Sequence, residues 1–86
     1  MIVIKHRSTG QVLREIDAET LVGYSFENCQ LEGANFAGAN LAGADFRCAN
    51  LRGADFQNAR LEKTGFQAAV LAGCDFTNAN RSEEHT

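Results

Sequence analysis

The sequence lacks most of the features from which function is usually inferred. Its longest apolar stretches fall well short of the roughly 20 residues that a helix needs to cross a bilayer, so we expect no membrane partner. Lys5 and Arg7 follow only a very short apolar run, unlike the basic start of a secretory signal. Lys and Arg number 8 against 11 Asp and Glu, a net charge of −3, so no basic patch predicts direct nucleic-acid binding.

Cysteine and histidine are equally sparse. The three cysteines are Cys29, Cys48 and Cys74, an odd number without C-x-x-C spacing, which predicts reduced thiols and a cytoplasmic location. His6 and His85 lie at opposite ends of the chain, and neither has a spaced Cys, Ser or acidic partner. We expect His6 to be a solvated residue and His85 to lie in a tail. No catalytic residue, metal site or cofactor site is predicted, so the chain is not expected to be an enzyme.

What the sequence does contain is a period of five. From Leu21 to Phe76 a large apolar residue occupies every fifth position, and leucine alternates strictly with phenylalanine. A helical stripe needs spacings of three and four, and a half-buried strand needs a spacing of two. Four five-residue segments that close a loop fit better. We expect these side chains to point inward as core ladders: Leu21, Phe26, Leu31, Phe36, Leu41, Phe46, Leu51, Phe56, Leu61, Phe66, Leu71 and Phe76.

The positions between these large residues repeat as well. From Leu31 onward a small residue, usually alanine, lies two positions before each large one, as Ala34 does before Phe36. Asn or Asp often comes directly before the large residue, and Gly or Asn often follows two positions after it. Since Gly, Asn and Asp tolerate turn conformations, the pattern predicts a tight corner every five residues. The glycines follow this period and therefore do not form a phosphate-binding loop.

The pattern Ala-(Asn/Asp)-(Leu/Phe)-x-Gly, as in residues 34–38 and in Ala44-Asp45-Phe46, resembles the pentapeptide-repeat family. About twelve repeats cover residues 21–80, as in a small bacterial-type member of that family. The resemblance implies an all-β fold, a right-handed quadrilateral β-helix with four pentapeptides per coil and parallel bridges between coils. We therefore expect about three coils.

In such a helix residues 20 apart lie above one another. The core would then consist of two leucine ladders and two phenylalanine ladders, and Glu27 would lie under Arg47 and Glu32 under Arg52. Cys29 falls in an inward position and serves as small apolar filler, whereas Cys48 falls at a corner, so their side chains should diverge. Residues 60–65 and 69–71 depart from the pattern, which indicates either drift at solvated positions or a local contact site.

The two ends differ. We expect residues 1–20 to form a cap, with strands over 2–7 and 11–16, a tight turn at 8–10, and residues 17–20 as a linker or one helical turn with Asp17 as its N-cap. Residues 21–80 form the repeat domain. We expect residues 81–86 to be a disordered tail. Their sequence also reads as a translated sequencing adapter, in which case they are an artefact and the natural chain continues.

Three functions remain open at this stage. We favour a non-catalytic structural or interaction module with a protein partner, since solenoids commonly bind other proteins. The alternative is a DNA mimic that modulates a topoisomerase such as gyrase, as some relatives do. DNA carries about one charge per 1.7 Å, so three coils about 4.8 Å apart would need about nine negative charges. Residues 21–80 hold six acids against four bases. The chain also fits a fragment of a longer or fused protein. Its uncapped last coil predicts either fraying after about Leu61 or end-to-end self-association.

Overall fold

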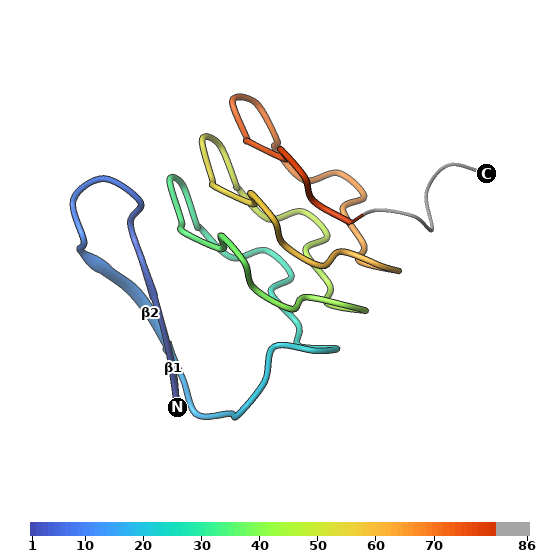
Figure 1. The fold of residues 1–86 in the computed structure, drawn as a ribbon, viewed down its shortest axis with the longest axis horizontal. Helices are drawn as coiled ribbons and strands as arrows, with labels where there is room; N and C mark the ends of the chain where they lie inside the picture. Colours follow the sequence, from blue (N-terminus) through green and yellow to red (C-terminus); the bar gives the residue numbers. More distant parts are fainter. Residues whose placement is uncertain (81–86) are drawn as a thin grey trace.

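The computed structural model describes residues 1–80. Two strands, β1 (Ile2–Lys5) and β2 (Val12–Ile16), form an antiparallel hairpin. After the hairpin the chain winds in stacked loops joined by isolated β-bridges, and the described residues contain no helix (Figure 1). The fold of the described residues is therefore all-β, as the resemblance to the pentapeptide-repeat family implied.

The hairpin differs from the prediction in its strand ends. β1 stops at Lys5, not at Arg7, and the connection to β2 runs from His6 to Gln11, longer than the tight turn expected at 8–10. The register shifts between Ile4 and Lys5, as at a β-bulge. We attribute the early end of β1 to a contact outside the hairpin, because His6 forms an antiparallel bridge with Ala34 of the repeat domain.

Residues 17–20 connect the hairpin to the repeats. The chain bends at Ala18 and Glu19, where the amide of Ala18 donates to the carbonyl of Ile16 at 2.9 Å. The alternative of a helical turn is wrong, and Asp17 caps no helix. The hydrogen bond back to β2 turns the chain directly toward Leu21.

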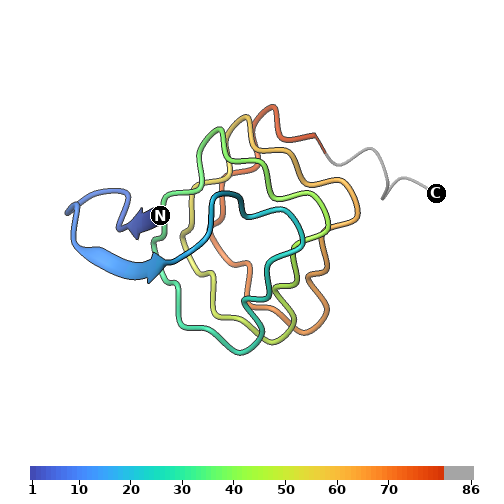
Figure 2. The same cartoon turned by 90° about the horizontal axis from the view of Figure 1, so that it is seen from below.

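Parallel bridges join positions 20 apart throughout the repeats, for example Ser25 with Asp45 and Asp45 with Gly65. We refer to residues 21–40, 41–60 and 61–80 as the first, second and third coils. Seen along the stack, they superimpose as roughly square outlines (Figure 2). Backbone hydrogen bonds run in both directions between coils: Phe26 N donates to Asp45 O at 2.6 Å, and Asp45 N donates to Tyr24 O at 2.9 Å.

The core consists of the large apolar side chains that the period selected. Phe26, Phe46 and Phe66 form one ladder of near-parallel rings, with centroids 4.8 and 5.4 Å apart. Rings of the second ladder, Phe36, Phe56 and Phe76, meet them edge to face. Offset stacks and edge-to-face pairs are the two arrangements that aromatic rings prefer. The leucines Leu31, Leu41, Leu51 and Leu61 are fully buried between the ladders.

The backbone conformation at the corners explains why Gly or Asn often lies two positions after a large apolar residue. The residue two positions after each large apolar one, from Gly23 to Asn78, has a positive φ, close to +60° or +70°. Most of these residues are glycine or asparagine, which adopt that conformation at low cost. Cys48, Lys63 and Ala68 occupy such corners without that advantage.

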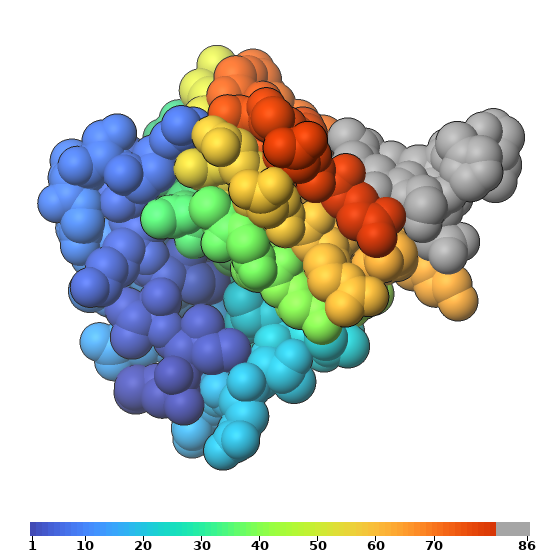
Figure 3. Space-filling model, in the orientation of Figure 1, coloured from blue at the N-terminus to red at the C-terminus, as the bar shows by residue number. Residues whose placement is uncertain are grey.

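Burial is unequal at the two ends of the stack. Ile4 and Ile16 of the hairpin are buried against the core at the first coil, and Figure 3 shows the hairpin, in blue, covering that end. In the third coil Phe66, Leu71 and Phe76 are only partly buried. The predicted core positions thus divide into nine buried ones, Leu21 to Leu61, and three partly exposed ones.

Candidate functional site

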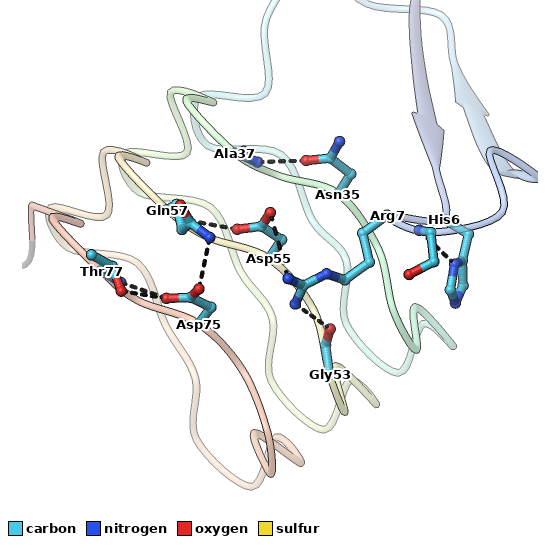
Figure 4. Close-up of polar contacts among 10 residues, drawn as sticks. His6, Arg7, Asn35, Ala37, Gly53, Asp55, Gln57, Asp75 and Thr77 are labelled. Carbon is cyan, nitrogen blue, oxygen red and sulfur yellow. Dashed lines mark hydrogen bonds and ion pairs between the residues drawn. The ribbon is translucent and has the colours of Figure 1, made fainter.

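The polar face of the stack nearest the hairpin tip holds the densest network of side-chain contacts (Figure 4). Asn35, Asp55 and Asp75 lie one above another, each directly before a core phenylalanine. Each side chain accepts a hydrogen bond at 3.0 Å from the backbone amide two residues later. This local bond is the reason that Asn and Asp favour the position, since it fixes the start of each corner.

Side chains also connect the second coil to the third on this face. The Gln57 amide donates to Asp75 Oδ2 at 2.7 Å, and the Thr77 hydroxyl donates to Asp75 Oδ1 at 2.6 Å. The Thr77 hydroxyl and amide, and then the Gln57 amide, lower the pKa of Asp75, because all of them donate to its ionised form. Asp75 is therefore held as a carboxylate.

Arg7 brings a positive charge to this face from the hairpin. Its Nη1 donates to the carbonyl of Gly53 at 3.1 Å, and its Nη2 lies 4.0 Å from Asp55 Oδ2. The side chain thus passes over the first coil and binds the second (Figure 4). This contact could not be predicted from the sequence, because it depends on where the hairpin docks.

His6 is not the solvated residue that the sequence predicted. Its side chain is half-buried, and its Nδ1 accepts hydrogen bonds from the amides of Ser8 and Thr9 at 3.1 and 3.3 Å. The ring also lies against Gly33, where an added Cβ would come within 2.3 Å of Nε2. His6 therefore shapes the hairpin tip and fits it to the first coil. His85, the other predicted histidine, lies outside the described residues.

The three cysteines occupy different surroundings and are all free. Cys29 is half-buried, and Cys48 is exposed at its corner. Cys74 is half-buried and its Sγ donates to the carbonyl of Leu51 at 2.9 Å. Burial raises the pKa of the Cys74 thiol, which favours its protonated form.

Two of the ion pairs between coils follow the predicted spacing. Arg47 Nη2 lies 3.6 Å from Glu27, and Arg52 Nε lies 3.7 Å from Glu32. Arg47 also binds Asp45 at 2.9 Å, and this bond lowers the pKa of Asp45 and raises that of Arg47. These side chains are substantially exposed, so the pairs contribute little beyond register and solubility.

The irregular stretch at 60–65 has a structural explanation in part. Thr64 occupies an inward position where other repeats have alanine, and its buried hydroxyl donates to the Leu41 carbonyl at 2.8 Å. Glu62 accepts a hydrogen bond from Asn80 at 2.7 Å and lies 3.5 Å from Arg60. An inward threonine could have been noticed from the sequence, since a buried hydroxyl must find a backbone partner.

Within residues 1–80 no pocket is formed, and no three His, Cys, Asp or Glu side chains are grouped in a way that could hold a metal ion. That part of the chain also has no helix of the length and hydropathy that crossing a membrane requires. The polar face can therefore offer hydrogen bonds and charge to a partner, and it has no enclosed volume for a small ligand.

Comparison with known proteins agrees with the geometry. The family model for pentapeptide repeats matches residues 25–62 with eight copies. A comparison with curated proteins gives no match. Members of such a family are generally structural modules without catalytic activity.

Proposed function

This chain is a pentapeptide-repeat protein, and we propose that it acts as a non-catalytic interaction module that docks another protein on an outer face of its β-helix. The observation that carries the proposal is the fixed ladder on the polar face. Asn35, Asp55 and Asp75 each hold the next corner through the same 3.0 Å bond. A preorganised array of this kind loses little conformational entropy when a partner binds.

Finer features of the fold belong to the same proposal. We infer that the twelve five-residue segments of residues 21–80 make three coils of a right-handed, four-sided helix. The support is the 20-residue offset of the parallel bridges. We also place the protein in a bacterial-type cytoplasm, where three free thiols remain reduced.

Mimicry of DNA is the weaker candidate because the acidic charge is largely neutralised. Of the six acids between residues 21 and 80, all except Asp75 lie within 4.0 Å of an arginine nitrogen. A DNA mimic needs a dense, uncompensated row of negative charge. We therefore expect the purified protein to leave the activity of a type II topoisomerase unchanged at micromolar concentration.

Site-specific photo-crosslinking tests the docking proposal. A photoreactive residue would replace an outward side chain on each face in turn, namely Ala42, Gln67, Ala72 or Thr77. In cells that express the protein, we expect crosslinks to one protein from one face, with Thr77 on the polar face giving the highest yield. Equal yields from all four positions, or none from any, would contradict a defined docking face.

A further inference from the structure

The hairpin tip, the connection from His6 to Gln11 between β1 and β2, is organised around one imidazole ring. Nδ1 of His6 accepts hydrogen bonds from the backbone amides of Ser8 and Thr9 at 3.1 and 3.3 Å. The backbone of His6 belongs to the same turn, because its amide donates to Gln11 O at 2.8 Å and its carbonyl accepts from Gly10 N at 3.1 Å. The tip in this conformation therefore requires that Nδ1 carries no proton.

The ring and the residue after it connect the tip to the repeat domain. The His6 ring fills the space beside Gly33 that an added Cβ would occupy. The amide of Arg7 donates to Gly33 O at 2.8 Å. The Arg7 guanidinium reaches the second coil, where Nη1 donates to Gly53 O at 3.1 Å and Nη2 lies 4.0 Å from Asp55 Oδ2 (Figure 4). Because Arg7 directly follows His6, a change in the conformation of the tip also moves the guanidinium.

The charges around His6 do not favour a protonated ring. None of the ion pairs within residues 1–80 includes His6. Its neighbours in the hairpin, Lys5 and Arg7, are both positive. On the coils, Glu32 lies next to the corner that the ring contacts, and its carboxylate lies 3.7 Å from Arg52 Nε. A proton on Nδ1 would therefore add a third positive charge to this stretch of the hairpin and would direct an N–H group at two N–H donors.

Histidine ordinarily gains its proton in the range of roughly pH 5 to pH 8. We propose that His6 is a pH-sensitive switch, whose protonation opens the hairpin tip and withdraws the Arg7 guanidinium from Gly53 and Asp55. Only the neutral ring accepts the hydrogen bonds from Ser8 and Thr9. The closed tip is therefore fully present above this range and is lost as the pH falls through it.

The switch changes the charge of the polar face. The Thr77 hydroxyl and amide, and then the Gln57 amide, lower the pKa of Asp75, and the positive charge of Arg7 lowers it further. Arg7 thus acts on Asp75 as well as on Asp55. When the guanidinium withdraws, both carboxylates remain in place. The polar face is therefore more negative at mildly acidic pH than at neutral pH.

A pH titration of the His85→Asn variant, followed by nuclear magnetic resonance, tests the switch. This substitution removes the other histidine of the sequence, so the remaining imidazole signal belongs to His6. We expect the His6 ring, the Arg7 amide and the Gly53 carbonyl carbon to change with one common midpoint between about pH 5 and pH 8. Across this midpoint the protection of the Arg7 amide against hydrogen exchange should fall at least about tenfold, as in local opening.

The amide of Asn35 serves as the internal reference. It donates to Lys5 O at 2.8 Å, and Ile4, the residue before Lys5, is buried independently of the ring. Its protection should remain unchanged while that of Arg7 falls. Loss of protection at Asn35 together with Arg7 would mean that acid releases the whole hairpin and not the tip, which would overturn the proposal.

His6→Asn, made in the same background, is the matched variant. Asparagine takes up no proton in this range, and its side-chain oxygen commonly accepts from the amide two residues later, as that of Asn35 does. We expect this variant to keep the Arg7 amide protected and the Gly53 signal constant over the whole titration. If it does not form the tip, the common midpoint in the His85→Asn protein still decides.

Four results would show that the proposal is wrong. The His6 ring could stay neutral over the whole range, or it could titrate without any change at Arg7 and Gly53. The changes at Arg7 and Gly53 could have a midpoint that differs from that of the ring. Finally, His6→Asn could lose protection at Arg7 with the same dependence on pH as the protein that retains His6.

Discussion

Among single residues, those of the second coil make the largest contribution to stability because they have neighbours in both adjacent coils. The Phe46 ring is fully buried and stacks between Phe26 and Phe66. Phe76 stacks on Phe56 and remains partly exposed. The contribution of a core phenylalanine to the free energy of unfolding therefore depends on the coil in which it lies.

Truncation of these rings tests that difference. We expect Phe46→Ala to lower the free energy of unfolding by about 3–5 kcal/mol, because it removes a buried ring and leaves a cavity. Phe76→Ala should cost clearly less. Urea denaturation followed by circular dichroism would measure both values. Equal losses would contradict the difference in burial between the coils.

Asp75 gives the fold a dependence on pH at the same scale. Its pKa is lowered in the folded protein, chiefly by the Thr77 hydroxyl, so the carboxylate stabilises the fold at pH values above the unfolded pKa of about 3.9. This contribution is lost as the pH falls through the lower, folded pKa. The side-chain oxygen of Asn35 accepts the same hydrogen bond from the backbone amide two residues later, so an asparagine can replace the aspartate in this contact.

We therefore expect Asp75→Asn to retain the fold at neutral pH and to lose less of its Tm than the natural sequence between pH 5 and pH 2. Thr77→Val, which removes the largest cause of the shift, should move the loss to higher pH. Thermal melts in a pH series would show both effects. Identical acid profiles for all three proteins would mean that Asp75 does not contribute.

At the scale of elements, the hairpin is attached by apolar burial and by polar contacts of unequal weight. Ile16 is nearly fully buried, whereas the Arg7 side chain is about one-third exposed and its ion pair with Asp55 is long at 4.0 Å. Exposed ion pairs contribute about 0–1 kcal/mol. The apolar contact should therefore dominate.

The two contributions separate in single variants. We expect Ile16→Ala to destabilise the protein by about 2–5 kcal/mol and Arg7→Ala by about 1 kcal/mol or less. Chemical denaturation would measure the two losses. A larger loss for Arg7→Ala would show that the polar contacts hold the hairpin.

The hairpin also shows where prediction from sequence ends. Its two strands were predicted as runs on either side of the turn at residues 8–10, but the early end of β1 and the contact between His6 and Gly33 were not. Both depend on docking against a coil about 27 residues later in the chain, which no local pattern encodes. The ladders and the Glu27–Arg47 pair could be predicted because a strict repeat converts sequence spacing into spatial contact.

For the molecule as a whole, protection should decrease along the stack. Amides of the third coil such as Gly65 and Val70 bond to the second coil, as Asp45 and Asn50 bond to the first. The third coil buries less apolar side chain, so it should open more easily. Hydrogen exchange should be faster at Gly65 and Val70 than at Asp45 and Asn50. Equal protection would mean that the last coil is held as firmly as the middle one.

The most direct test of the account is whether residues 20 apart are neighbours. Nuclear Overhauser effects in solution would measure this between backbone protons of bridged positions. We predict cross-peaks for Ser25 with Asp45, Asn35 with Asp55 and Asn50 with Val70, where parallel bridges join successive coils. Strong contacts at spacings of three and four with none at twenty would contradict the stacked β-helix and every inference drawn from it.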